Sequence, residues 1–223
     1  MINKVVLHNS VSLDGSFVGL DPDMELHYRI VGHYRPDAYM AGSATAKSGI
    51  EMFGPDAPPE SEADFEKPAK DPSLAYWVIP DTRGTLQGLL HHFRRYEHCR
   101  DVIVLVSKAT PASYLSYLDE RGYDHIQAGD DRVDHRRAFG ALAATYGMST
   151  ILVDSGRTLG NVLLNAGLVD EISLLVAPQI VGRDGKNLFA DVAVKTGLAC
   201  TRCEMFPGGH VWLTYDATGR RGD

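Results

Sequence analysis

Residues 151–182 constrain the fold of this chain more than any other segment. They open with an apolar run, residues 151–153, which predicts a buried strand. Apolar residues then recur at helical spacing, at Leu159, Val162, Leu163 and Leu168. Gly167 is typical of a helix C-cap, and residues 170–176 again predict a strand. The stretch therefore predicts a strand–helix–strand unit of an α/β protein.

The turn inside this stretch has a composition that suits an anion. Asp154, Ser155 and Gly156 lead directly from the strand into the helix. The first N–H groups of a helix lack intrahelical partners, and the helix dipole favours negative charge there. A phosphate group binds well at such a place. The same residues also suit an ordinary unit in which Gly156 only permits a tight turn, so both interpretations stay open.

Length and composition limit the class of protein. The chain has 223 residues, enough for one full-sized core, and we expect a single domain over residues 1–223. A net charge of −7 argues against a nucleic-acid-binding surface. The sequence has no apolar run long enough to span a bilayer, and its first residues lack the apolar core of a signal peptide. We therefore expect a cytoplasmic protein with neither nucleic-acid nor membrane partners.

The cysteines do not predict a metal or disulfide framework. There are three, and Cys200 and Cys203 form a C-x-x-C without the second ligand pair of a zinc site. In the strand predicted here, the two side chains would face opposite sides of the sheet. We expect a structural role for them and no metal site.

The rest of the chain alternates between predicted strands and helices. The strands are predicted over residues 4–11, 38–41, 77–79, 102–106, 123–127, 198–206 and 210–215. The helices are predicted over residues 25–34, 85–96, 111–121 and 134–146. Residues 54–73, rich in proline and acidic residues, predict a surface insertion. The alternation predicts a three-layer α/β fold, with a mostly parallel central sheet and a C-terminal antiparallel hairpin.

Ligands of such sheets bind beyond the carboxyl ends of the strands. We expect a pocket there, formed by the turns at Gly15, Gly42, Asp81, Ser107 and Asp154.

Several motifs resemble those of one enzyme family. Residues 158–182, TLGNVLLNAGLVDEISLLVAPQIVG, carry the most specific match. Further matches are the Ser-Leu-Asp-Gly at residues 12–15, the segment from Asp37 to Gly42 with Thr45, Asp81 after the third strand, and the Val-Asp pair at residues 133–134. From about residue 4 to residue 190 the chain resembles the pyrimidine reductases of riboflavin biosynthesis. These have the dihydrofolate-reductase-like fold and include the C-terminal domain of the bifunctional deaminase–reductase.

The resemblance implies NADPH as hydride donor. The cofactor-binding residues that it implies are Gly42, Thr45, Asp81, Ser107, Ser155, Gly156, Arg157, Thr158 and Leu159. It also implies a homodimer, and a small-molecule substrate of the 2,5-diamino-6-ribosylamino-pyrimidinone 5′-phosphate type. The ribosylamino group would be reduced to ribitylamino.

For the substrate, the resemblance implies two catalytic carboxylates, Asp14 and Asp154; the family has Glu where this chain has Asp154. Whether Asp14, Asp154 or water donates the proton stays open. Substrate-binding residues are predicted at Asn9, Ser12, Arg35 and Arg183, the arginines for a phosphate group. Four of these residues also have a plainer interpretation: a turn-stabilising role for Asp14, a solvent-facing strand position for Asn9, and ordinary surface positions for Arg35 and Arg183.

The chain also departs from the family. Ser155 replaces the first glycine of a Glu-Gly-Gly, and its Cβ could crowd a pyrophosphate. The sequence has no H-x-E and no P-C-x-x-C, so zinc-dependent deamination is not expected. Two alternatives stay open: a reductase of a pterin or another small carbonyl or imine, and a non-catalytic nucleotide-binding member of the fold.

Overall fold

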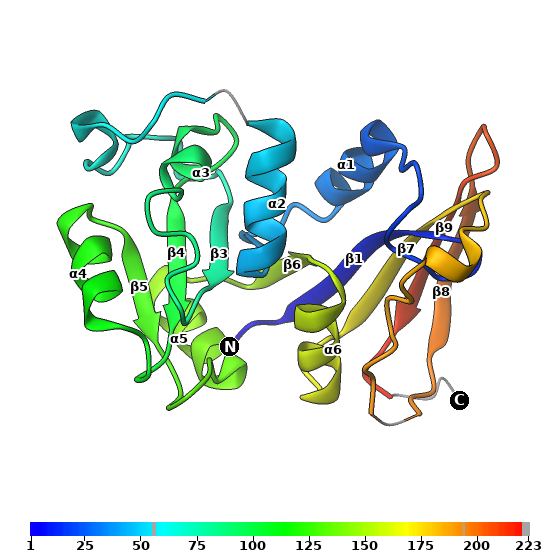
Figure 1. The fold of residues 1–223 in the computed structure, drawn as a ribbon. Coiled ribbons are helices and arrows are strands. Elements are labelled where there is room, and N and C mark those ends of the chain that lie inside the picture. Colours follow the sequence, from blue (N-terminus) through cyan, green and yellow to red (C-terminus); the bar gives the residue numbers. More distant parts are fainter. Residues whose placement is uncertain (55–56, 194, 220–223) are drawn as a thin grey trace. The chain divides into compact units, whose positions relative to one another are not determined.

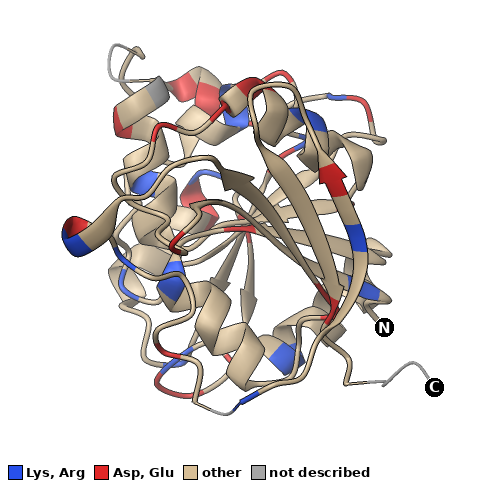
Figure 2. Ribbon diagram, turned by 90° about the vertical axis from the view of Figure 1, so that its right-hand side faces the viewer, with Lys and Arg blue, Asp and Glu red and all other residues tan. Residues whose placement is uncertain are grey.

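The fold comes from a computed structural model that describes residues 1–54, 57–193 and 195–219. The chain forms two compact units (Figure 1). Unit 1 contains residues 1–2 and 37–149, and unit 2 contains residues 3–36 and 150–223. Basic and acidic residues are interspersed along the ribbon (Figure 2). Within the described ranges, no helix is long and apolar enough to cross a membrane.

Unit 2 is built on a sheet whose first three strands are parallel. In spatial order the strands are β6 (Thr150–Asp154), β1 (Lys4–Ser12), β7 (Glu171–Ala177), β9 (Val211–Asp216) and β8 (Ala199–Met205). Strands β9 and β8 form the antiparallel hairpin predicted from the sequence. The helices are α1 (Met24–His33), α6 (Arg157–Asn165) and the short 3-10 helix η2 (Gly182–Asp184).

Alternating side chains of β1 meet different helices. Leu7 contacts α6 so closely that a Cβ on Gly160 would lie 3.2 Å from its Cδ1. On the other face, His8 and Ser10 contact His27 of α1. Unit 2 therefore has three layers, and the α1 face of its central strand carries polar side chains.

Unit 1 is built on a parallel sheet. Its strands, in spatial order, are β5 (Asp124–Gln127), β4 (Val102–Val106), β3 (Tyr76–Pro80) and β2 (Ala38–Met40). Its helices are α2 (Ser43–Phe53), η1 (Glu62–Asp64), α3 (His91–Arg95), α4 (Ala112–Glu120) and α5 (His135–Tyr146). Every residue of β4 is buried, as expected for a strand covered on both faces. Val102, Val104 and Val106 pack in one core with side chains of α2, α3 and α4.

In unit 1, one predicted helix was wrong in extent and one observed helix was missed. The helix predicted over residues 85–96 is limited to α3, because residues 85–90 form turns. Asp81 accepts the backbone N–H groups of Thr85 and Leu86, and Gly84 and Gly88 have φ of 71° and 77°. Such φ values end a helical path. Helix α2 was missed, because only a small-residue turn was predicted after Gly42.

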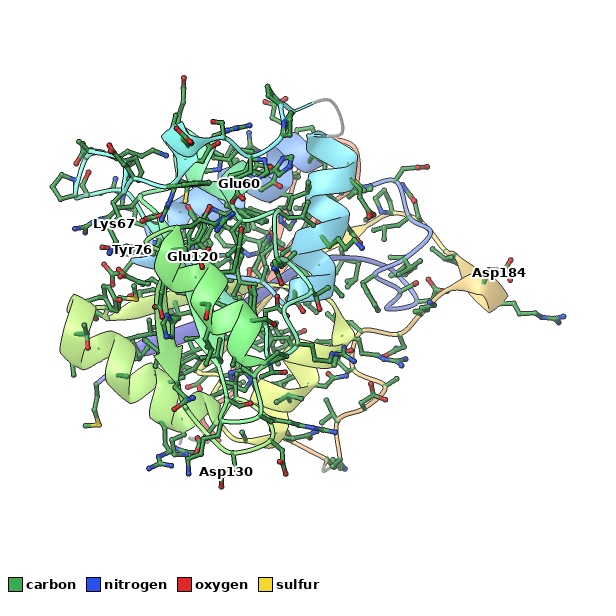
Figure 3. The ribbon with its side chains drawn as sticks, turned by 60° about the vertical axis from the view of Figure 1, so that its left-hand side comes forward. Glu60, Lys67, Tyr76, Glu120, Asp130 and Asp184 are labelled. Carbon is green, nitrogen blue, oxygen red and sulfur yellow. The ribbon has the colours of Figure 1, made fainter. Side chains whose placement is uncertain are left out.

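The insertion at residues 54–73 is tied to unit 1, although residues 55–56 lie outside the described part. Arg95 donates to both carboxylate oxygens of Asp64, at 2.8 and 2.6 Å. Arg121 donates to Glu60, which is labelled in Figure 3, and the distance is 2.8 Å. Arg94, which is buried, donates to the carbonyl oxygen of Asp64 at 2.7 Å. These bonds attach the loop to the ends of α3 and α4.

The prediction that Cys200 and Cys203 face opposite sides of the sheet was wrong. A β-bulge lies between Cys200 and Arg202. Cys200 therefore pairs with Tyr215 and Cys203 with Leu213, which are two residues apart on β9 and share one face. Both thiols are free and exposed. Among the described residues, no group of three or more His, Cys, Asp or Glu side chains is placed to hold a metal ion.

Candidate functional site

Asn9 and Ser155 meet at the carboxyl edge of the parallel strands of unit 2. Asn9 is only 7% exposed, so its solvent-facing interpretation does not hold. Its Nδ2 donates to the carbonyl oxygen of Ser155 at 3.0 Å. Its Oδ1 is buried and has no hydrogen-bond partner in the described residues. Such an oxygen is costly to leave unpaired, which favours a ligand that donates a hydrogen bond to it.

Helix α6 begins next to Ser155 without a side-chain cap. Gly156 is its N-cap residue, and its first turn contains no acidic side chain. Ser155 is buried, Thr158 is exposed and Leu159 belongs to the core. The Arg157 guanidinium forms an ion pair of 2.8 Å with Asp191. The start of α6 therefore keeps the chemistry of an anion site, while Arg157 has a protein partner.

Asp14 stabilises the loop that follows β7. The Ser12 hydroxyl donates to its carboxylate at 2.6 Å, and the N–H groups of Gly182 and Val181 donate at 2.8 and 3.2 Å. These three bonds, that from Ser12 foremost, lower the pKa of Asp14 to about 2. The geometry supports the turn-stabilising interpretation of this residue.

The register of the sheet separates the two predicted carboxylates. Asp154 pairs with His8 of β1, whereas Asp14 follows Ser12, four residues further along the same strand. At a rise of about 3.3 Å per residue, Ser12 lies roughly 13 Å beyond His8. Asp14 and Asp154 therefore do not meet at one reacting atom.

A cluster of polar residues, which the sequence did not predict, lies beside Asp154 on the α1 face. We define the histidine cluster as His8, Ser10, His27, Asp154 and Ser173. His27 Nε2 lies 3.1 Å from Asp154 Oδ2, and His27 Nδ1 lies 2.9 Å from Ser10 Oγ. His8 Nδ1 lies 2.9 Å from Ser173 Oγ, and the two histidine rings are 4.6 Å apart. The one local signal was the run of polar residues His8, Asn9 and Ser10, which follows three apolar residues in the same strand.

Burial and charge set the ionisation of the cluster. Burial, with His27 nearby, lowers the pKa of His8 to about 3, so His8 is neutral. Burial disfavours ionisation of Asp154, but the hydrogen bond and charge of His27 outweigh it and hold the pKa of that carboxyl below its usual range. Asp154 is the exposed end of the cluster, with 34% of its side chain accessible.

The two arginines predicted for a phosphate lie at opposite edges. Arg183 is exposed in η2 and follows Gly182, whose N–H donates to Asp14. Figure 3 shows Asp184, of the same short helix, projecting outward. Arg35 follows Tyr34, whose hydroxyl donates to Glu171 at the amino end of β7. The structure does not bring Arg35 to Asn9 or Asp154.

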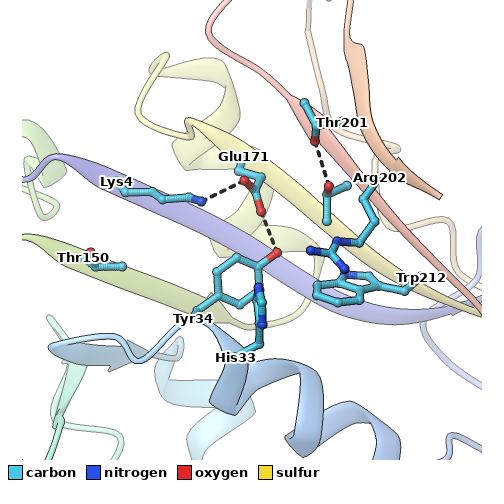
Figure 4. A pocket seen from close by; sticks show the side chains of 9 residues that line it. Lys4, His33, Tyr34, Thr150, Glu171, Thr201, Arg202 and Trp212 are labelled. Atoms are coloured by element: carbon cyan, nitrogen blue, oxygen red, sulfur yellow. Dashed lines mark hydrogen bonds and ion pairs between the residues drawn. The ribbon is translucent and has the colours of Figure 1, made fainter. Parts of the chain in front are cut away.

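A cavity of about 370 Å³ also lies at this amino edge (Figure 4). The side chains of Lys4 and Tyr34 both reach Glu171, at 2.8 and 2.5 Å, and Arg202 lies over the Trp212 ring. Lys4 and Glu171 of the cavity thus form an ion pair, and Arg202 packs on an aromatic ring. The cavity is separate from the carboxyl edge where Asn9 and Asp154 lie.

The predicted residues of unit 1 lie at the carboxyl ends of its own strands. Gly42 is the N-cap of α2, which lacks a side-chain cap, and Thr45 is in its first turn. Both carboxylate oxygens of Asp81 accept backbone N–H groups of the following turn. Ser107 is fully buried, and its Oγ has no partner among the residues described.

A second cavity, of about 230 Å³, lies beside Ser107. It is lined by Lys108 after β4, by residues 126–129 at the end of β5 and just beyond it, and by α5. It contains two basic side chains, Lys108 and Arg137. Lys108 forms an exposed ion pair of 2.8 Å with Asp130. Sequence patterns did not single out these two cations, because they come from different elements.

Comparison with known proteins assigns the chain to a family. The sequence model of the family described as the RibD C-terminal domain matches residues 3–212. A curated relative from Methanothermobacter thermautotrophicus, 2,5-diamino-6-ribosylamino-4(3H)-pyrimidinone 5′-phosphate reductase, is 33% identical over 98 residues. That match covers 44% of each protein, so it spans less than half of the relative.

Solved structures show the same fold. A pyrimidine reductase-like protein from Corynebacterium diphtheriae has a TM-score of 0.72 at 21% identity, over 96% of this chain and 91% of its own. RibD from Acinetobacter baumannii has a TM-score of 0.67 at 20% identity, over 96% and 58%. The Saccharomyces cerevisiae riboflavin biosynthesis reductase Rib7 has a TM-score of 0.67 at 16% identity, over 96% and 90%. With the strand order, these likenesses confirm the predicted fold class.

Proposed function

This chain belongs to the family of RibD C-terminal domains, and we propose that it is an NADPH-dependent reductase of riboflavin biosynthesis. Its substrate would be a 2,5-diamino-6-ribosylamino-pyrimidinone 5′-phosphate, whose ribosylamino group is reduced to ribitylamino. The name of the curated relative supports this substrate. One family model spans residues of both units, so we propose one reductase domain over residues 1–223. We further propose, from the family resemblance alone, that it is a cytoplasmic homodimer.

The buried oxygen of Asn9 carries the substrate part of the proposal. A diaminopyrimidine presents N–H donors on its ring, and Asn9 Oδ1 is a buried acceptor without a partner in the described part. Asp154 lies one strand away, with part of its carboxylate exposed. Asp154 is the last residue of β6, and Asn9 lies one residue beyond the middle of β1. Both therefore lie toward the edge where ligands of α/β sheets bind, with their side chains on opposite faces of the sheet.

The start of α6, in unit 2, has the features of a phosphate site, and so does the start of α2, in unit 1. Both helices follow a strand, both have a glycine N-cap, and neither has a side-chain cap or an acidic residue in its first turn. Ser155, which replaces a glycine, is buried with its carbonyl oxygen held by Asn9. These donors fit NADPH, which supplies the hydride when it is bound.

The chain's own residues supply the remaining requirements of the reaction. When the imine carbon of the open-chain ribosyl group accepts a hydride, the imine nitrogen must accept a proton. Asn9 would orient the pyrimidine ring, and Asp154 would be the carboxylate nearest the nitrogen. Asp14 would hold the loop after β7 in place and would not contact the reacting atoms.

The second cavity of unit 1 supports a preference for NADPH over NADH. Lys108 and Arg137 line a space of about 230 Å³, large enough for a phosphate group. Two cations at this place suit the 2′-phosphate that distinguishes NADPH. The ion pair of Lys108 with Asp130 is highly exposed and therefore weak enough to exchange for a ligand.

Turnover of the pyrimidine substrate tests the proposed function. The purified protein is expected to oxidise NADPH when the ribosylamino-pyrimidinone phosphate is present. Asn9→Ala is expected to raise the KM for this substrate about 10-fold, the effect of one lost hydrogen bond. Asn165→Ala is the matched control, since Asn165 bonds the chain near Asp191 at the far end of α6. Saturable NADPH binding without turnover of pyrimidine, pterin or carbonyl substrates would instead identify a non-catalytic protein.

The cofactor preference is tested by calorimetric titration. Arg137→Ala is expected to weaken NADPH binding about 10-fold and to leave NADH binding unchanged, because NADH has no 2′-phosphate. Arg136→Ala, on the same helix but outside the cavity lining, is expected to change neither. Equal losses for both cofactors would rule out the 2′-phosphate assignment.

A further inference from the structure

The histidine cluster gives Asp154 an internal partner. Ser10 and His8 on β1, His27 on α1 and Ser173 on β7 are all buried or half-buried, and Asp154, at the end of β6, has 34% of its side chain accessible. His27 is central, because its two ring nitrogens contact Asp154 Oδ2 and Ser10 Oγ. Both contacts are compatible with a doubly protonated ring that donates in two directions.

The surroundings of His27 single out Asp154 as its charge partner. From β1 it faces Ser10 and the neutral His8, from its own helix the Tyr28 ring packs edge-on, and from β6 it faces the Asp154 carboxylate. No second carboxylate forms an ion pair with it among the described residues. A proton on His27 is therefore balanced by Asp154 alone.

We infer that His27 is the positioning residue that holds Asp154 and keeps a proton behind it for the reduction. This inference rests on the proposed function. In the proton step, the His27 Nε2–H bond breaks as the proton moves to Asp154 Oδ2. Asp154 then gives a proton to the imine nitrogen of the substrate, while the imine carbon receives the hydride. His27 is left neutral with its Nδ1–H, Asp154 returns to carboxylate, and solvent restores the proton between turnovers.

The assignment explains the shorter side chain at position 154. An aspartate at the end of β6 places one oxygen on His27 at 3.1 Å while its side chain stays partly accessible. His8 contributes as a neutral neighbour, fixed by Ser173, whose hydroxyl is in turn held by the Trp212 indole N–H at 2.9 Å. The cluster thus connects the core of unit 2 to its exposed carboxylate.

The split between kcat and KM tests the inference. His27→Gln, which can donate but cannot carry a proton, is expected to lower kcat about 100-fold. The KM for NADPH is expected to be unchanged. His33→Gln is the matched control, since His33 is an exposed histidine on the same helix, and it is expected to behave like the wild type.

Two outcomes would overturn the inference. One is a His27→Gln variant that is folded, as judged by an unchanged melting temperature, and keeps the wild-type kcat. The other is an NMR spectrum in which Asp154→Asn leaves the resonances of the His27 ring unchanged; loss of the contact between Asp154 Oδ2 and His27 Nε2 is expected to move them. The NMR arm needs no turnover. An inactive wild-type protein whose His27 resonances still depend on Asp154 would count against the proposed function, not against the pairing.

Discussion

At the scale of single residues, the predicted site side chains differ in whether the fold already satisfies their polar atoms. Both carboxylate oxygens of Asp14 and of Asp81 accept hydrogen bonds from backbone N–H groups of a neighbouring loop. Asn9 and Ser107 each keep a buried oxygen that has no partner within the described ranges. Sequence motifs could suggest all four, but the deciding partners of Asp14 lie more than 160 residues away.

The role of Asp14 as a loop anchor predicts a pH-dependent loss of stability. Its folded pKa is about 2, below the ordinary value, so its stabilisation is complete above the unfolded pKa and disappears as the pH falls through about 2. Asp14→Asn is therefore expected to lower the melting temperature at neutral pH, and the difference from wild type is expected to vanish near pH 2. Thermal unfolding monitored by circular dichroism at several pH values measures this difference in melting temperature.

Asp21→Asn provides the control, because Asp21 is exposed and its side chain accepts no bond from the 181–182 loop. This variant is expected to match the wild type at every pH. A constant difference between Asp14→Asn and wild type across the pH range would contradict the anchoring role.

At the scale of elements, periodicity located most strands and helices to within a few residues. Strand β4 was predicted with its observed bounds, because an unbroken apolar run is typical of a strand covered on both faces. Helix α2 was missed because its first two turns, SATAKSG, consist mainly of small residues, although Ala46 and Ile50 lie one turn apart and pack in the core. The first half of the helix predicted at 85–96 failed because Gly88, inside it, has a φ of 77°, which ends a helical path.

Opposite effects on stability are predicted for substitutions at two helical glycines, Gly160 in α6 and Gly140 in α5. A Cβ at Gly160 would lie 3.2 Å from a methyl group of Leu7, which is fully buried and cannot easily move. Gly160→Val is therefore expected to destabilise the protein by about 1–3 kcal/mol. Gly140 lies inside α5, is exposed and has open space around it, so Gly140→Ala is expected to stabilise by about 0.5–1 kcal/mol. Urea unfolding measures both; a stabilised Gly160→Val variant would contradict the close packing.

At the scale of the whole molecule, the family motifs predicted the fold class and the family, both of which are confirmed. The histidine cluster was not predictable in the same way, because His8 and His27 are 19 positions apart and meet Asp154 only through the sheet register and the placement of α1. The same holds for Lys108 and Arg137, which come from a loop and a helix. Local patterns therefore predicted the scaffold, and the tertiary structure supplied the groups that we propose for proton supply and cofactor preference.

The transfer of a labelled hydride tests the central claim most directly. NADPH deuterated at both positions of its nicotinamide C4 would be incubated with the protein and the ribosylamino-pyrimidinone phosphate, and the product analysed by mass spectrometry. We expect a ribitylamino product that carries one deuterium on the former imine carbon, formed at the rate of NADPH oxidation. Recovery of unchanged substrate, or of a reduced product without deuterium, would contradict the assignment of this chain as an NADPH-dependent pyrimidine reductase.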